Sequence, residues 1–109
     1  MNNLINKYGL TERDMQTLHD ILYKYPEVLL VHIFGSRAKG TNKPGSDIDL
    51  AIMNKGTGSQ TLLRLKSDFE ESSLPYKVDL VEFHTLTNPD FVENIKQEGT
   101  IFYQRVESN

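Results

Sequence analysis

Two aspartates, Asp47 and Asp49, lie two residues apart in a segment that alternates between polar and apolar residues. In a β-strand this spacing places both carboxylates on one face, with their Cα atoms about 6.5 to 7 Å apart. Like charges this close repel each other, and one divalent cation bound by both side chains removes the repulsion. Hard oxygen ligands of this kind suit Mg²⁺ or Mn²⁺. An isolated Asp-x-Asp pair is more often a solvated face of a sheet, so the pair alone assigns no site.

A glycine and a serine, Gly35 and Ser36, follow an apolar run, and ten residues separate Ser36 from Asp47. Glycine lets a ligand approach the backbone closely, and amides near Ser36 can donate to phosphate oxygens. The intervening segment contains no acid and three bases, which are Arg37, Lys39 and Lys43. A basic loop beside an acidic strand matches a metal-chelated nucleoside triphosphate, which needs cations for its phosphates and carboxylates for its metals. The alternative is an ordinary solvated Gly/Ser turn.

The rest of the chain predicts the elements that position these groups. Helices are expected at residues 11–25, 59–72 and 88–99, and strands at 28–34, 47–53, 76–83 and 100–103, the last at a sheet edge. Residues 35–46 are expected to form a loop that can include a short turn of helix. This order is typical of an α/β (α+β) fold in which helices flank a small mixed β-sheet. We therefore expect a single domain over residues 1–109.

Capping residues predict where the helices begin. Thr11 and Asp14 have the spacing of a capping box, and Ser59 can cap the second helix. Asn88 followed by Pro89 is a favourable start for the last helix.

Composition excludes several classes of protein. With 38% hydrophobic and 25% charged residues, the 109-residue chain is expected to fold as a soluble globule without a membrane segment. A net charge of -3 disfavours a dedicated nucleic-acid binder. The absence of cysteine excludes disulfides and thiolate metal sites, and no aliphatic run is long enough for a signal peptide, so we expect a cytoplasmic protein.

Together these motifs resemble the nucleotidyltransferase superfamily of the DNA polymerase beta type. Its signature is a hydrophobic residue, Gly, Gly or Ser, a spacer of about ten residues, and Asp-hydrophobic-Asp-hydrophobic. This chain reads Phe34-Gly35-Ser36, ten residues, then Asp47-Ile48-Asp49-Leu50. The superfamily also uses a third carboxylate on a later strand, and Asp79 lies in a segment of that type. The residues that surround both motifs look like those of the minimal nucleotidyltransferases of bacteria and archaea.

The resemblance implies the nucleotidyltransferase fold and a role for each matching residue. It implies that two Mg²⁺ ions, with Mn²⁺ as an alternative, are bound by the catalytic carboxylates Asp47, Asp49 and Asp79. Asp79 would also help to deprotonate the acceptor hydroxyl. The β and γ phosphates of ATP or another nucleoside triphosphate would be held by Gly35 and Ser36, with Arg37 as a charge partner.

The resemblance also implies a partner. Minimal nucleotidyltransferases are often paired with an all-helical HEPN protein in toxin–antitoxin systems, in which the nucleotidyltransferase is the antitoxin. Some transfer AMP from ATP to a tyrosine of the toxin and silence its ribonuclease activity. The alternatives are a non-catalytic antitoxin that covers the toxin surface, and nucleotidyl transfer to a small molecule such as an aminoglycoside. A second copy of the chain could also complete the site.

Two other signals are set aside. The pair Gly35 and Gly40 has the glycine spacing of a P-loop, but Thr41-Asn42 replaces the required Lys-Ser/Thr. The three histidines are scattered and have no metal-ligand spacing.

Overall fold

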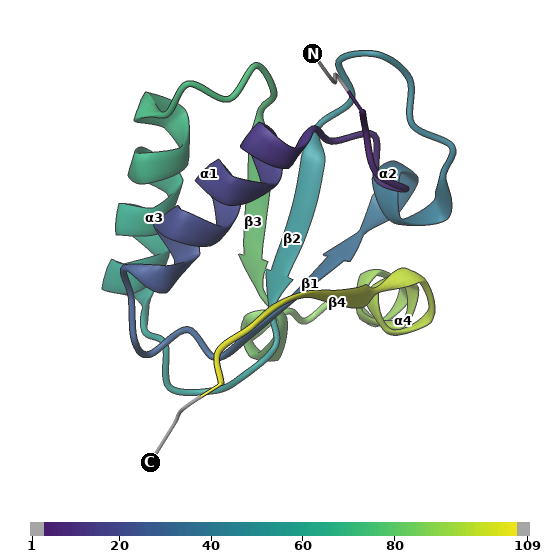
Figure 1. Cartoon of the computed structure of the whole chain (residues 1–109). Helices are drawn as coiled ribbons and strands as arrows, with labels where there is room; N and C mark the ends of the chain where they lie inside the picture. Colours follow the sequence, from purple (N-terminus) through teal and green to yellow (C-terminus); the bar gives the residue numbers. More distant parts are fainter. Residues whose placement is uncertain (1–3, 107–109) are drawn as a thin grey trace.

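Every helix and strand expected from the sequence is present in the computed structural model, which describes residues 4–106 (Figure 1). The helices are α1 (Glu12–Tyr23), α2 (Gly35–Lys39), α3 (Ser59–Glu71) and α4 (Pro89–Glu98), and a short 3-10 turn spans Phe83–Thr85. The strands are β1 (Leu30–Phe34), β2 (Ile48–Ile52), β3 (Val78–Glu82) and β4 (Thr100–Gln104). The first and last three residues of the expected 1–109 domain lie outside the described residues.

The four strands form one mixed sheet in the order β3-β2-β1-β4. β1 pairs antiparallel with both β2 and β4, whereas β2 and β3 are parallel. A parallel pair needs a crossover connection, and α3 provides it between β2 and β3. The expected α/β architecture with a small mixed sheet is confirmed, and β4 lies at the expected edge.

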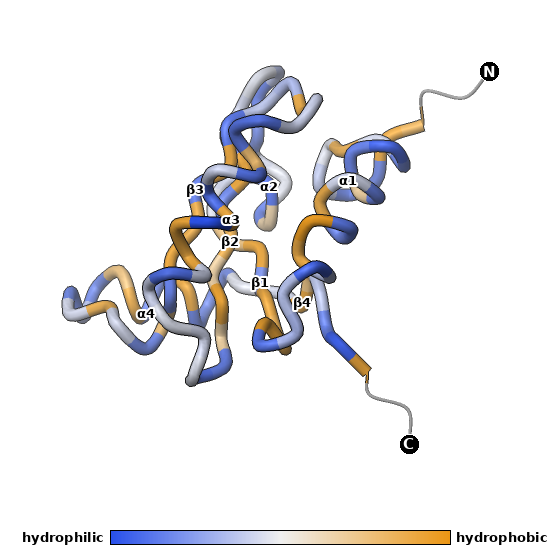
Figure 2. The backbone as a smooth tube through the Cα atoms, turned by 90° about the vertical axis from the view of Figure 1, so that its left-hand side faces the viewer, coloured by the Kyte–Doolittle hydropathy of each residue, from blue (hydrophilic) through white to orange (hydrophobic). Residues whose placement is uncertain are grey.

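The larger hydrophobic core lies between the sheet and the helices α1 and α3. Ile48, Leu50 and Ile52 of β2 are fully buried in it, as the alternating pattern of β2 predicts. The two helices contribute the buried residues Leu18, Leu22, Leu65 and Phe69. Figure 2 shows α1 and α4 on opposite sides of the strands, so the sheet is covered on both faces.

The face of the sheet toward α4 carries a smaller apolar cluster next to the acidic residues. Its buried members are Phe34, Ala51 and the α4 residue Ile95. Asp49 alternates with the core residues of β2 and therefore shares the face of Ala51. The pattern that buries one side of β2 thus directs the Asp49 carboxylate toward α4.

The segment after β1 is a short helix followed by a loop, as its composition allows. α2 begins at Gly35, whose φ of 76° lets the chain turn from strand to helix without a linker. It ends at Gly40, which adopts the left-handed conformation, and the Thr41 amide donates to the Ser36 carbonyl at 2.9 Å. The short turn of helix that the sequence allowed is a five-residue helix.

The helices begin close to the predicted residues. Thr11 and Asp14 form the expected capping box, and Asn88 caps α4. The predicted cap at Ser59 is wrong by one residue, because Gly58 is the N-cap and Ser59 is already helical. No helix within residues 4–106 has the length and apolar character needed to cross a membrane.

Candidate functional site

Two of the predicted site carboxylates face each other across neighbouring strands. Asp49 of β2 and Asp79 of β3 are directly paired in the parallel register. Hydrogen-bonded strands lie about 4.8 Å apart, so side chains of paired residues on one face are in close proximity. Asp49 and Asp79 both line a cavity of about 340 Å³ on the α4 side of the sheet.

The cavity combines the acidic pair with the turn that follows β1 and one face of α4. Phe34, Gly35 and Lys39 come from the first strand–helix turn, and Val81 comes from β3. From α4 come Phe91, Asn94 and Glu98. The glycine turn and the carboxylates, which are far apart in sequence, therefore border one space.

Asp49 is held in an unfavourable electrostatic environment. Partial burial raises its pKa from 3.8 to about 6, and the negative charges of Asp79 and Asp47 add to this shift. Glu98 raises the pKa further, whereas the positive charge of Arg37 lowers it. The site therefore concentrates negative charge, which a bound cation would relieve.

Asp47 occupies a different position from Asp49 and Asp79. It immediately precedes β2, its residue is exposed, and it is absent from the residues that line the cavity. Its backbone carbonyl accepts a hydrogen bond from Arg37 Nε at 3.3 Å. The structure thus brings Asp49 and Asp79 together, with Asp47 beside them at the entrance to β2.

Gly35 lies against the Asp49 side chain, which leaves no room for a Cβ atom unless that side chain shifts. A Cβ atom at Gly35 would overlap Asp49 Oδ2 and lie 3.1 Å from its Cγ. The φ of 76° adds a conformational reason, because residues with a side chain adopt this region at a cost. Ser36 follows as the second residue of α2 and is half-buried.

Arg37, for which the resemblance implies the role of a charge partner of the phosphates, lies beneath the turn, where its guanidinium bonds to backbone carbonyls. It is 1% exposed, and its guanidinium donates to the carbonyls of Tyr8 at 2.9 Å and Ser46 at 2.7 Å. The guanidinium also stacks on Tyr76, with 4.4 Å between Cζ and the ring centroid. Arg37 therefore ties the N-terminal segment to the residues that lead into β2.

The acidic pair fits a divalent cation only as part of a ligand set. Within residues 4–106, no group of three His, Cys, Asp or Glu side chains is arranged to hold a metal ion. Mg²⁺, however, is commonly bound by one or two carboxylates together with waters and substrate phosphates. The oxygen ligands of Asp49 and Asp79 fit such a shared site, because their mutual repulsion favours a cation between them.

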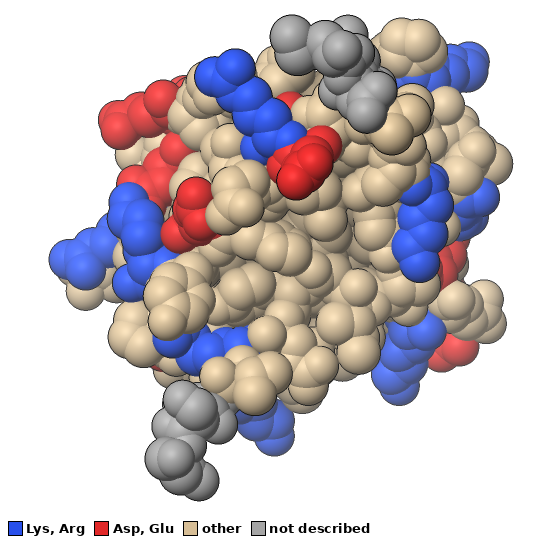
Figure 3. Space-filling model, viewed as in Figure 1, with Lys and Arg blue, Asp and Glu red and all other residues tan. Residues whose placement is uncertain are grey.

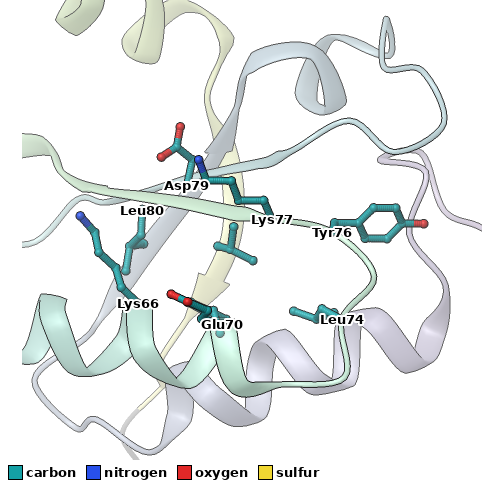
Figure 4. A pocket seen from close by; sticks show the side chains of 9 residues that line it. Lys66, Glu70, Leu74, Tyr76, Lys77, Asp79 and Leu80 are labelled. Atoms are coloured by element: carbon teal, nitrogen blue, oxygen red, sulfur yellow. The ribbon is translucent and has the colours of Figure 1, made fainter.

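A larger cavity, of about 520 Å³, lies on the other side of β3, between this strand and α3 (Figure 4). Its lining includes Lys66, Glu70, Leu74 and Tyr76. Asp79 borders both cavities, but Figure 4 shows its carboxylate pointing away from the α3 residues. The Asp79 carboxylate therefore faces the smaller cavity.

Sequence reasoning missed the contribution of α4 to the site. Phe91, Asn94 and Glu98 have the spacing i, i+3, i+7, which places them on one face of a helix. That face was predictable from the spacing. Its position over the acidic strands was not, because it depends on how α4 packs on the sheet.

Sequence comparisons match most of this chain to known proteins. A family model described as polymerase beta, nucleotidyltransferase matches residues 16–108. A protein of Haemophilus influenzae named probable protein adenylyltransferase MntA is 34% identical over 97 residues, which cover 88% of this chain and 84% of the relative.

Solved structures of toxin–antitoxin complexes show the same fold. A complex with AMP-PNP has a chain that superimposes with a TM-score of 0.67 at 22% identity, covering 84% of this chain and 74% of that one. A complex of tri-AMPylated Shewanella oneidensis HEPN toxin with MNT antitoxin gives a TM-score of 0.55 at 20% identity, with 84% and 73% covered.

We predict that Arg37→Lys lowers the free energy of unfolding by about 2 to 3 kcal/mol, because an ammonium group leaves buried carbonyls without a donor. Urea unfolding measures the change. Arg13→Lys, on the exposed surface of α1, is the control and should change stability by less than about 0.5 kcal/mol. Equal effects of the two substitutions would contradict the anchoring role of Arg37.

We predict that Asp49→Asn stabilises the chain above pH 6 in buffer containing EDTA. The pKa of Asp49 rises from 3.8 to about 6 on folding, so the folded chain binds the proton more tightly and stability falls as pH rises through this range. Removing the charge should raise the melting temperature by a few degrees at pH 8, with little difference near pH 3. If the difference in melting temperature between Asp49→Asn and wild type is the same at pH 8 and pH 3, the charge of Asp49 does not destabilise the folded chain.

Proposed function

The chain belongs to the polymerase beta nucleotidyltransferase family, and we propose that it is an Mg²⁺-dependent enzyme that transfers AMP from ATP to a protein hydroxyl. The proposed acceptor is a tyrosine of an all-helical HEPN-type toxin, for which this chain would act as antitoxin. The observation that carries the proposal is the shared cavity of the Gly35 turn and the Asp49 and Asp79 carboxylates, in a homologue of MntA. The proposed compartment is the cytoplasm.

The residues around the cavity have distinct proposed tasks. The backbone of Gly35 and Ser36 would hold the β and γ phosphates, since no side chain at Gly35 blocks the approach. Asp47, Asp49 and Asp79 would hold the Mg²⁺ ions. When bound, Mg²⁺ neutralises charge on the phosphates and on the attacking and leaving oxygens.

In the proposed transfer, the acceptor oxygen forms a bond to the α-phosphorus of ATP. The bond between this phosphorus and the bridging oxygen breaks, and pyrophosphate leaves. The Asp79 carboxylate accepts the proton of the acceptor hydroxyl and returns it to solvent. Arg37 acts indirectly, because its buried guanidinium positions the segment from Ser46 to Asp47.

A protein acceptor is supported by what relatives bind. The Haemophilus influenzae relative is named a probable protein adenylyltransferase, and the Shewanella oneidensis complex contains an AMPylated HEPN toxin. Figure 3 shows Lys and Arg interspersed with Asp and Glu on one face of the molecule, so this face is not the continuous basic surface that favours a polynucleotide. Transfer to a small molecule, and inhibition by binding alone, remain the competing outcomes of the test.

The deciding experiment incubates the chain with a purified HEPN-type toxin, Mg²⁺ and ATP labelled at the α-phosphate. We predict that wild type labels the partner and that Asp49→Asn or Asp79→Asn lowers the rate about 100-fold or more. Glu70→Gln, in the other cavity, is the control and should retain the activity.

Labelled pyrophosphate from γ-labelled ATP would confirm the bond that breaks. If the partner receives no label while both Asn variants still inhibit its ribonuclease activity, the chain acts by binding alone. Label on an aminoglycoside instead of the partner would identify a small-molecule acceptor.

We predict that Gly35→Ala abolishes most transfer activity, whereas Gly40→Ala leaves it close to wild type. Both glycines have a positive φ, so each substitution adds a similar backbone strain of about 1 to 2 kcal/mol. Only the methyl group at Gly35 meets the Asp49 carboxylate, since a Cβ at Gly40 has no atom within 4 Å. Displacing a catalytic group by about 1 Å can cost about 100-fold in rate, which the labelling assay resolves.

A further inference from the structure

The Glu98 carboxylate lies at the end of α4 and binds two donor groups of the turn that begins at Gly35. Its Oε1 accepts a hydrogen bond from the Gly35 amide at 3.2 Å. Its Oε2 pairs with Lys39 Nζ at 3.5 Å. Both oxygens of one anionic side chain are therefore engaged by one amide and one cation of the same turn.

This arrangement places a third acid in a cavity that already contains two. Asp49, Asp79 and Glu98 line the same space, so Glu98 adds to the local negative charge. Like charges in a partly desolvated cavity repel, and the contact is held by the donors at Gly35 and Lys39. These donors form a small anion site that is filled by the chain itself.

We propose that Glu98 occupies a phosphate position of the nucleotide site and that ATP must displace it to bind. The inference rests on the proposed function, since it assigns a competitor to the phosphates that the Gly35 turn would hold. A phosphate group supplies more charge and more acceptor oxygens than a carboxylate, so it can replace Glu98 at both donors. Glu98 thereby sets the affinity of the site for the triphosphate.

The side chain can leave without unfolding of α4. Glu98 is the last residue of the helix, and the backbone there is held by the hydrogen bond from the Gly99 amide to the Ile95 carbonyl at 2.8 Å. The Glu98 side chain is 24% exposed and that of Lys39 is 51% exposed, so both can move toward solvent. A change of rotamer is therefore sufficient to free the Gly35 amide.

The competition has a measurable consequence. When only a fraction of molecules have the site free, the apparent dissociation constant exceeds the intrinsic one by the inverse of that fraction. Removing the charge of Glu98 weakens its hold on Gly35 and Lys39 and increases the free fraction. Nucleotide affinity should then rise even though a residue of the cavity has been changed.

Isothermal titration of the full chain with ATP or inorganic tripolyphosphate, each with Mg²⁺, tests the proposal. Glu98→Gln should bind both about tenfold more tightly than wild type. Tripolyphosphate lacks the base, so an equal gain for both ligands locates the effect at the phosphates. Glu93→Gln removes the same charge from an exposed position of α4 and should leave both affinities unchanged.

The amide resonance of Gly35 provides a second measurement that does not depend on nucleotide. In the free chain, Glu98→Gln should shift this resonance, because the acceptor of its hydrogen bond loses its charge, whereas Glu93→Gln should not. Glu98→Asp, which withdraws the carboxylate from Gly35 but keeps its charge, should shift it as well. A lower melting temperature of Glu98→Gln without tighter binding would assign Glu98 a purely structural role and overturn the proposal.

Failure of this inference and failure of the proposed function give different experimental results. If wild type binds MgATP and Glu98→Gln binds it no more tightly, or more weakly as expected of a metal ligand, the inference is wrong and the proposed function stands. If neither wild type nor Glu98→Gln binds MgATP or tripolyphosphate, both fall. Tighter binding by Glu98→Gln in a chain that labels no partner retains the inference and removes the proposed acceptor.

Discussion

The contact between the Gly35 backbone and the Asp49 carboxylate is the constraint on which the site depends. A Cβ atom at Gly35 would overlap this carboxylate and displace it, and the φ of 76° further favours glycine where the chain turns from β1 into α2. The same turn exposes the Gly35 amide to the cavity, where the amide donates a hydrogen bond to the Glu98 carboxylate. One glycine therefore serves the turn, the close packing and the anion contact.

Arg37 provides the buried positive charge that complements this acidic region. It is two residues after Gly35, is almost completely buried, and donates to carbonyls on both sides of the turn. Burial of a charge is costly unless it is paired or hydrogen-bonded, and here carbonyl oxygens and the Tyr76 ring surround it. Arg37 also lowers the pKa of Asp49, which opposes the effect of the neighbouring acids.

At the cavity, the placement of charged side chains opposes the stability of the folded chain. Elsewhere in β2, alternation and burial agree, as the fully buried Leu50 and Ile52 show. At Asp49 the alternation places a partly buried carboxylate beside Asp79, and its pKa is raised first by burial and then by repulsion from the neighbouring acids. Conflicts of this kind are expected at functional sites, where stability is lost in exchange for binding a cation or substrate.

The order of the elements and the faces of the central strands were predictable from local information. Ile48, Leu50 and Ile52 alternate with Asp49, and a period of two assigns each residue to a face whatever the partner strands are. The capping box at Thr11 was equally predictable, because it is a local feature of the sequence. The cap at Ser59 was misplaced because Gly58 adopts a conformation that composition does not reveal.

The sequence by itself determined which residues could do chemistry here, because the spacing of Gly35, Asp47 and Asp49 and the strand pattern around Asp79 are local properties of the chain. Only the tertiary structure decided what these residues face. Register between β2 and β3 pairs Asp49 with Asp79, packing of α4 brings Glu98 to the Gly35 amide, and burial turns Arg37 toward backbone carbonyls. These contacts join residues that are distant along the chain, and only the packing of helices on the sheet brings them together.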